Sequence, residues 1–184
     1  MGNVGGRARI LLVDDRRENL IALDAILSAI GDATLIQVRS GEQALTELSQ
    51  TEYAVVLLDV RMPGLDGFET ARRIRAGTRN SSVPIIFLTA ASTRPDAAFR
   101  GYTSGAVDYL AKPFDPWVLT AKVSIFVALY LKQLDRAELL AARIGAIEEA
   151  VAVMTKIPAV TADPAALDAL ADLERLIAQL RAIG

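Results

Sequence analysis

The sequence AVVLLD, residues 54–59, places five consecutive apolar residues directly before a carboxylate, Asp59. Turn-forming Pro63 and Gly64 follow closely, so the run predicts a short strand that is buried on both faces of a sheet. In open α/β sheets, ligands bind at the carboxyl ends of the strands. Asp59 is therefore the first candidate for a functional residue.

Other apolar runs on both sides of this strand have the length and composition of strands. The expected strands are 9–13, 34–38, 54–59, 84–88 and 106–110. The segments between them carry apolar residues at helical spacing and predict helices over 19–30, after Ser40, over 68–75 and over 95–104. Strands that alternate with helices in this way predict an α/β fold, with a doubly wound, five-stranded parallel sheet.

The composition excludes several kinds of site. The chain has 184 residues, 52% of them hydrophobic, which is enough for a substantial core. Its 20 basic and 22 acidic side chains are nearly balanced, which argues against a nucleic-acid binder. It contains no cysteine and no histidine, so disulfides, thiolate or histidine metal sites, Ser-His-Asp triads and a phosphohistidine within the chain are excluded.

No segment has the pattern of a signal peptide or a membrane anchor. Residues 1–9 lack an apolar run. The longest later apolar stretch, 123–131, has about nine residues, far fewer than the roughly 20 that span a bilayer. We therefore expect a cytoplasmic protein without a membrane partner.

Reactive side chains stand at the ends of four of the expected strands: Asp14 and Asp15, Asp59, Thr89 and Lys112. The carboxyl ends of parallel strands meet at one edge of the sheet, so these residues should converge. Three close carboxylates need a cation, and Mg²⁺ prefers such oxygen ligands. A carboxylate nucleophile beside Mg²⁺, a lysine and a hydroxyl can accept a phosphoryl group.

Each residue alone has a simpler interpretation. Asp14 or Asp15 could cap the helix that follows, and Thr89 could also be a cap. Tyr109 could be a half-buried aromatic of the sheet, and Lys112 a surface lysine. Only the combination at the expected strand ends favours a phosphoryl-transfer site.

The combination resembles the receiver domain of two-component response regulators (CheY-like). The motifs that carry the resemblance are Asp14-Asp15, DVRMPGLDG at 59–67, Thr89-Ala90 and Lys112-Pro113-Phe114. The resemblance covers roughly residues 8–125. It implies the flavodoxin-like strand order 2-1-3-4-5, and a cognate histidine kinase or phosphotransfer protein as partner.

The resemblance also implies roles for the acidic residues. Asp59 matches the phosphoacceptor, and Asp15 matches a direct Mg²⁺ ligand. Asp14 would act mainly through a metal-bound water, and the backbone carbonyl of Arg61 would complete the protein ligands of the metal together with Asp59.

Four further positions match the reporting part of the family's site. Thr89 and Lys112 match the switch hydroxyl and the lysine that contacts the phosphoryl group. Tyr109 matches the switch aromatic. The bond between Lys112 and Pro113 matches one that is cis in the family.

Beyond residue 125 the sequence predicts a separate helical extension, 126–184, after a receiver domain over 1–125. A helix from Pro116 to residue 157 would be roughly 60 Å long. Its expected heptad seam is Leu119, Val123, Phe126, Tyr130, Gln133, Ala137, Leu140, Ile144, Ile147, Val151 and Met154. A second helix begins at Asp163-Pro164, with a stripe of Leu167, Leu170, Leu173, Ile177 and Leu180.

Three arrangements of these helices stay open. Hairpins from two chains could form a four-helix bundle, the long helices could pair as a parallel coiled coil, or the last helix could cover the long one within one chain. The first two make the protein a homodimer. DNA-binding output is not expected, because no helix-turn-helix or basic stripe is visible.

The leading hypothesis is a response regulator that is phosphorylated on Asp59 and signals through Tyr109, the last receiver helix and the helical tail. Such a protein is not an enzyme beyond its own phosphorylation and dephosphorylation. The alternatives are a fragment of a longer protein with an enzymatic output domain, and a phosphatase with an Asp nucleophile. The phosphatase would need a second acid in a D-x-D pattern, but position 61 is Arg.

Overall fold

The structure is a computed structural model, and it describes residues 8–77, 79–90 and 108–183. The chain divides into two compact units, Met1–Leu131 and Lys132–Gly184. The functional boundary that we expect after residue 125 stays a prediction.

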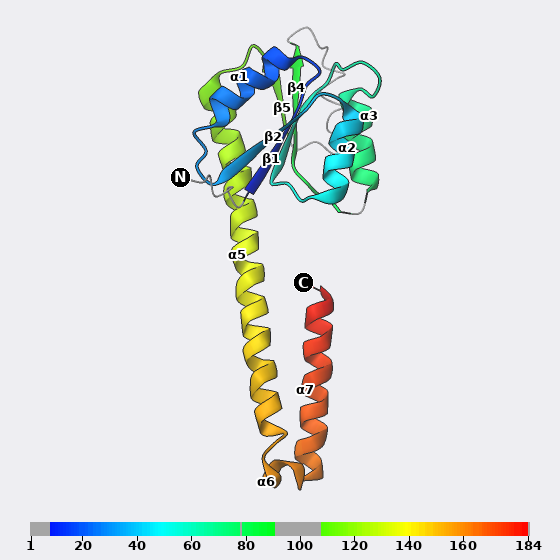
Figure 1. Ribbon diagram of the computed structural model, residues 1–184, viewed down its shortest axis with the longest axis vertical. Coiled ribbons are helices and arrows are strands. Elements are labelled where there is room, and N and C mark those ends of the chain that lie inside the picture. Colours follow the sequence, from blue (N-terminus) through cyan, green and yellow to red (C-terminus); the bar gives the residue numbers. More distant parts are fainter. Residues whose placement is uncertain (1–7, 78, 91–107, 184) are drawn as a thin grey trace. The chain divides into compact units, whose positions relative to one another are not determined.

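The described part of the first unit contains five parallel strands in the order β2-β1-β3-β4-β5, which confirms the expected fold (Figure 1). The strands are β1 Ala8–Val13, β2 Ala33–Val38, β3 Val55–Asp59, β4 Ile85–Ala90 and β5 Asp108–Lys112. All five residues of β3 are buried, as expected for a central strand whose two faces are both covered.

The last two strands differ from their expected ranges. Strand β4 continues through Thr89, and β5 continues through Lys112, so both residues lie inside strands and not after them. The parallel pairing of Thr89 with Ala111 and of Ala90 with Lys112 explains the extension, because each strand continues as long as its neighbour does. The helix expected over 95–104 and residues 106–107 of the fifth strand lie outside the described residues.

Three helices pack on the described part of the sheet before the long helix begins. They are α1 Arg17–Leu27, α2 Gly41–Gln50 and α3 Gly67–Ala76. Ser40 caps α2 as expected, because its side chain accepts a hydrogen bond from the backbone of Gln43. Helix α1 ends earlier than expected, since a four-residue turn closes it before Gly31, in which the backbone nitrogen of Ile30 donates to the carbonyl oxygen of Leu27.

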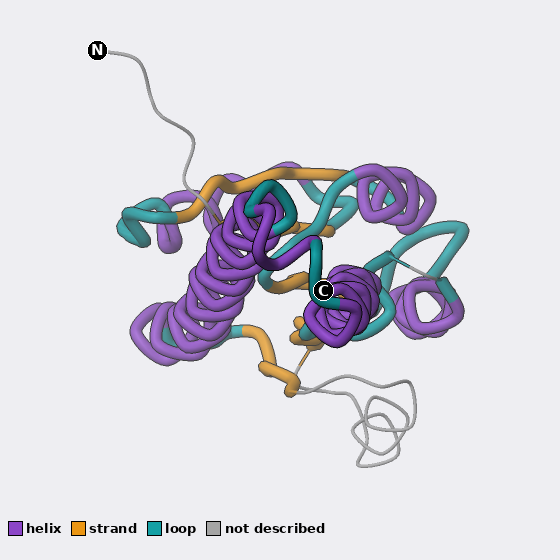
Figure 2. Tube along the Cα trace, turned by 90° about the horizontal axis from the view of Figure 1, so that it is seen from below, coloured by secondary structure: helices purple, strands orange, loops and turns teal. Residues whose placement is uncertain are grey.

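The helices form two layers, one on each face of the sheet. Helices α1 and α5 (Pro116–Met154) cover one face, and α2 and α3 cover the other (Figure 1). Figure 2 shows the same arrangement from below, with strands between helices. Each face has its own cluster of buried apolar side chains, so the carboxyl ends of the strands are held by a core on both sides.

A buried asparagine, Asn80, hydrogen-bonds the backbone segment that leads from α2 into β3. The Asn80 side chain donates to the carbonyl oxygens of Leu48 and Thr51 and accepts from the backbone of Tyr53. It therefore satisfies three backbone groups that leave the end of α2 and enter the central strand.

Helix α5 is one continuous element of 39 residues, three residues shorter at its C-terminal end than expected. Asp115 caps it, since its side chain accepts from the backbone of Trp117. By length and composition alone, α5 could cross a membrane. Its first turns, however, bury Leu119, Val123 and Val127 in the core beside the sheet, as a core helix of a globular domain does.

The second unit is a helical hairpin. The last part of α5 is followed by the short helix α6, Pro158–Thr161, and then by α7, Pro164–Ile183, which returns alongside α5 (Figure 1). Ile144 and Val151 of α5 are buried against Leu170 and Ile177 of α7. The Asp163 side chain caps α7 as expected.

The heptad seam expected along α5 is not one continuous stripe. In the first unit Leu119 and Val123 face the sheet, and in the second unit Ile144 and Val151 face α7. The alternate seam positions Leu140, Ile147 and Met154 are exposed. Different elements therefore cover different parts of the seam, the sheet in the first unit and α7 in the second. Likewise, Leu167 and Leu180 of the α7 stripe are exposed.

Candidate functional site

The reactive residues at the strand ends share one cavity of about 210 Å³. The cavity is lined by Asp14, Asp15, Arg16, Asn19, Asp59, Arg61, Thr89 and Lys112. Five of these side chains, those of Asp14, Asp15, Asp59, Thr89 and Lys112, were expected to converge from residues far apart in the sequence.

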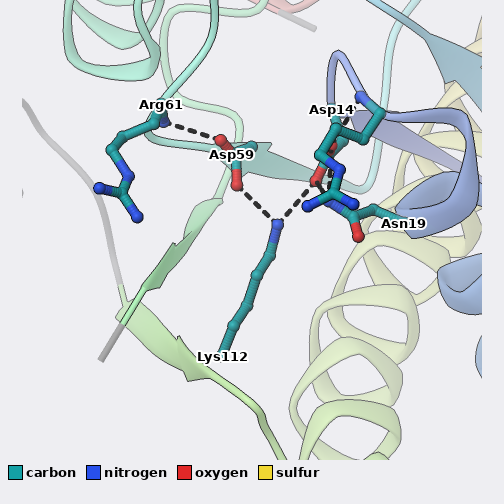
Figure 3. A network of polar contacts seen from close by, with 6 residues as sticks. Asp14, Asn19, Asp59, Arg61 and Lys112 are labelled. Atoms are coloured by element: carbon teal, nitrogen blue, oxygen red, sulfur yellow. Dashed lines mark hydrogen bonds and ion pairs between the residues drawn. The ribbon is translucent and has the colours of Figure 1, made fainter. Parts of the chain in front are cut away.

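Lys112 connects two of the carboxylates. Its Nζ atom lies 2.6 Å from Oδ1 of Asp59 and 2.7 Å from Oδ2 of Asp14 (Figure 3). Asp14 is completely buried and Asp59 is nearly so. An ammonium group between two buried carboxylates balances charges that would otherwise repel each other in a low-dielectric site.

Asn19 is a site residue that the sequence did not reveal. Its Nδ2 atom donates to both oxygens of Asp14 at 2.9 Å, and the backbone nitrogen of Arg16 donates to Oδ1 at 3.0 Å. In the sequence Asn19 only indicates the start of a helix. Its position five residues after Asp14, in the first turn of α1, is the one signal that could have pointed to this role.

Asp15 is held through its backbone. The guanidinium of Arg39 at the end of β2 donates to the carbonyl oxygen of Asp15, from Nε at 3.3 Å and from Nη2 at 3.1 Å. The Arg39 backbone in turn donates to the Gln43 side chain at 2.8 Å. Arg39 therefore connects the loop of Asp14 and Asp15 to the start of α2.

The loop after Asp59 folds back on the carboxylate. The backbone nitrogen of Arg61 donates to Oδ2 of Asp59 at 2.7 Å. Gly67 donates to the carbonyl oxygen of Val60 at 3.0 Å and packs closely on the strand end, since a Cβ at this position would overlap with the backbone oxygen of Asp59. The phosphoacceptor candidate therefore has one carboxylate oxygen on Lys112 and the other on the backbone.

The surroundings of Asp59 and Lys112 shift the pKa values of both side chains. Burial raises the pKa of the Asp59 carboxyl above its ordinary value, and the opposing ion pair with Lys112 does not cancel this effect. Burial alone would lower the pKa of Lys112, but its contacts with Asp14 and Asp59 outweigh burial and raise it. Lys112 is therefore held in its charged form.

The donor chemistry of the cavity fits Mg²⁺, because carboxylates and a backbone carbonyl are the oxygen ligands that this ion prefers. Among the described residues, however, no three acidic side chains are grouped closely enough to form a ready metal site. The Lys112 ammonium lies between Asp14 and Asp59. It places a protein cation between two of the carboxylates expected to bind the metal.

The residues expected to report phosphorylation lie on the last two strands. Thr89 is buried and lines the cavity. Tyr109 on β5 is 44% exposed, and its neighbour Asp108 forms an ion pair with Lys122 of α5. The peptide bond between Lys112 and Pro113 is cis.

A family model described as "Response regulator receiver domain" matches residues 10–124. The chain belongs to this family. Receiver domains are the parts of response regulators that are phosphorylated on an aspartate, and residues 10–124 include all the motifs in which the resemblance was first noted.

Individual relatives agree with this assignment. The DNA-binding response regulator MtrA of Mycolicibacterium paratuberculosis is 40% identical over 117 residues, which are 64% of this chain and 50% of MtrA. The response regulator PleD of Caulobacter vibrioides is 35% identical over 147 residues, which are 79% of this chain and 32% of PleD. The chain thus spans about half of MtrA and about a third of PleD.

A solved structure with the same fold contains the metal. It is the receiver domain of the sensor histidine kinase PA1611 from Pseudomonas aeruginosa, with a magnesium ion coordinated in its active-site cleft. It is 35% identical, has a TM-score of 0.61, and covers 67% of this chain and 99% of its own.

Proposed function

We propose that this receiver domain accepts a phosphoryl group on Asp59 in a Mg²⁺-dependent reaction. The observation that supports the proposal best is the position of Asp59, next to the Lys112 ammonium and in one cavity with Asp14, Asp15 and Thr89. A carboxylate nucleophile, a fixed positive charge and further acidic oxygens are the groups that phosphoryl transfer requires.

In the proposed step, a carboxylate oxygen of Asp59 attacks the phosphorus of a donor, and the bond from phosphorus to the leaving atom breaks with its electron pair. The product is an acyl phosphate on Asp59. Lys112 donates to the phosphoryl oxygens, and the hydroxyl of Thr89 lies in the same cavity to donate as well. Mg²⁺ held by Asp14, Asp15, Asp59 and the Arg61 carbonyl would neutralise the phosphoryl charge.

The donor is a cognate histidine kinase or a phosphotransfer protein. These 184 residues contain no histidine, so the phosphohistidine that serves as donor must lie outside them. We place the reaction in the cytoplasm and assign this chain no catalysis beyond its own phosphorylation and dephosphorylation.

The experiment is incubation of the full chain with acetyl phosphate, with and without Mg²⁺, followed by intact-mass measurement. We expect one phosphoryl group per chain with Mg²⁺ and none in Asp59→Asn. Asp24→Asn is the matched control, because Asp24 only accepts a hydrogen bond from Gln37 on the surface. Phosphorylation of Asp59→Asn, or its loss in Asp24→Asn, would contradict the assignment.

We infer that the output passes through Tyr109, helix α5 and the helical tail to a protein partner, the simplest partner being a second copy of the chain. The ion pair between Asp108 and Lys122 supports this route, because it connects the strand of Tyr109 with α5. Light scattering with and without beryllium fluoride and Mg²⁺ tests it. No change in mass, shape or partner binding would contradict a phosphorylation switch.

The similarity to PleD favours a second candidate function, because this match extends over 147 residues of the chain. In that case the chain is the receiver and signalling helix of a longer protein with an enzymatic output domain. The stop codon of the encoding gene distinguishes the two.

A further inference from the structure

The tail hairpin, residues 132–183 as the structure describes them, has a polar edge. A groove of about 550 Å³ runs along it between α5 and α7, with Glu148, Ala152 and Thr155 on one side and Glu174, Ala178 and Arg181 on the other. Arg181 and Glu148 form an ion pair across this groove at 2.8 Å. Four polar side chains, Glu148, Thr155, Glu174 and Arg181, therefore lie on this edge beside Val151 and Ile177.

The opposite edge of the hairpin is apolar. In α5, Val151 faces α7. Ala152 and Thr155, one and four positions later, lie on the polar edge. Residues on the other side of Val151 must turn the opposite way, and these include Ile147 and Met154. They are 41% and 46% exposed.

Helix α7 follows the same rule. Ile177 faces α5, while Ala178 and Arg181 turn to the polar edge. Leu176 and Leu180, one position before and three after Ile177, turn to the same edge as Ile147. They are 50% and 38% exposed. We call this surface the apolar edge, and define it as Leu140, Ile147, Met154, Leu176 and Leu180.

The apolar edge consists of side chains that are unfavourable to leave in water. Its five members are between 38% and 50% exposed. Two copies that cover each other's apolar edges would remove ten such side chains from water, and burial of apolar surface is the main favourable contribution to most protein association. Contiguous exposed apolar side chains often mark a protein interaction site.

The charges of the tail favour a second copy over a lipid surface. Residues 132–184 contain six basic and eight acidic side chains, so the unit has no excess positive charge to attract anionic lipids. Two hairpins of nearly zero net charge, in contrast, repel each other little and can share their apolar edges as the core of a four-helix bundle.

We propose that the apolar edge binds the apolar edge of a second copy, in a twofold interface with Ile147 near its centre. The inference rests on the proposed homodimer and names its surface. The interface combines three positions of the heptad seam expected along α5, Leu140, Ile147 and Met154, with Leu176 and Leu180 of α7. A twofold interface uses one patch twice, so the residue nearest the axis meets its own copy.

The first test measures the mass of the full chain by light scattering, before and after treatment with acetyl phosphate and Mg²⁺. We expect a dimer in at least one of the two states, and a twofold lower mass for the variant Ile147→Glu with Leu176→Glu. Ala152→Glu is the matched control on the polar edge and should keep the wild-type mass. Circular dichroism verifies that each variant keeps its helices.

The second test uses disulfide cross-linking and introduces no charge at the interface. The chain contains no cysteine, so a single introduced thiol is unique. Under mild oxidation, Ile147→Cys should form a covalent dimer, whereas Ala152→Cys on the polar edge should not. This test decides the matter even where the glutamate variant does not fold.

A wild-type chain that is monomeric in both states overturns the proposal. Cross-linking at position 152 without cross-linking at 147 also overturns it. A chain that takes up a phosphoryl group on Asp59 and stays monomeric contradicts the dimer alone. A dimer that takes up no phosphoryl group supports the apolar edge and contradicts only the proposed phosphoacceptor.

Discussion

Asn19 donates through one side-chain nitrogen to both carboxylate oxygens of Asp14, at 2.9 Å each. Together with the backbone of Arg16 and the ammonium of Lys112, it fixes the orientation of a carboxylate that is completely buried. The protein thus positions Asp14 by its own donors.

Asn19→Ala should lower the free energy of unfolding by about 1–3 kcal/mol, because it removes a donor from a buried carboxylate. Without Mg²⁺, Asn19→Asp should lower the free energy of unfolding more than Asn19→Ala does, since it places a second carboxylate beside Asp14. Addition of Mg²⁺ should restore part of that stability. Urea unfolding with and without Mg²⁺ measures both. Gln37→Ala, which removes an exposed bond to Asp24, is the control; equal effects of Asn19→Ala and Gln37→Ala would refute the role of Asn19.

Lys112→Met should leave Asp14 and Asp59 facing each other without a cation. We expect a loss of about 2 kcal/mol or more in metal-free buffer, and a larger stabilisation by Mg²⁺ than in the wild type, because the metal replaces the missing charge. Lys122→Met is the control, since its ion pair with Asp108 is more exposed and should contribute less than about 1 kcal/mol. The same Mg²⁺ response in wild type and Lys112→Met would show that Lys112 and the metal do not compete for the site.

Two glycines should respond oppositely to alanine. At Gly67 a Cβ would overlap with the backbone oxygen of Asp59 and lie 2.9 Å from Cα of Val60, so Gly67→Ala should destabilise the receiver domain by about 2 kcal/mol or more. At Gly145, in α5, nothing lies within 4 Å of an added Cβ, and alanine should stabilise the helix by up to about 1 kcal/mol. Thermal unfolding followed by circular dichroism compares them. Stabilisation by Gly67→Ala would mean that the loop after Asp59 is less tightly packed than described.

Burial raises the pKa of the Tyr53 hydroxyl to about 12 from an ordinary value of 10.0, and the hydrogen bond to Glu47 at 3.0 Å adds to the effect. The folded state therefore holds this proton more tightly than the unfolded state. The associated stability is fully present below pH 10 and is lost as the pH rises through about 12. Urea unfolding over this range should show a steeper decline for the wild type than for Tyr53→Phe. Parallel curves would contradict the shift.

The sequence predicted the receiver fold well because its signals are local. The five apolar residues before Asp59 predict a central strand, and the residues at the other strand ends then converge because the strands are parallel. The position of Lys112 inside β5 was missed, because a strand's last residue depends on how far its neighbour extends.

The remaining details depend on contacts that no pattern encodes. In the sequence, Asn19 has only the pattern of a residue near the start of a helix. In the structure, the turn after Asp14 brings the Asn19 amide within hydrogen-bond distance of the Asp14 carboxylate. In the tail, spacing shows which residues share a face of α5, but it does not show that α7 covers Ile144 and Val151 and leaves Ile147 exposed.

The Asn80 side chain has a consequence for the order in which this domain assembles. It binds backbone groups of Leu48, Thr51 and Tyr53, all of which precede the central strand, yet it follows α3 in the chain. A nascent chain that has left the ribosome only as far as Asp59 lacks the group that completes the entrance to its own central strand. The backbone groups that lead into the central strand thus gain their side-chain partner only after about twenty further residues have been synthesised.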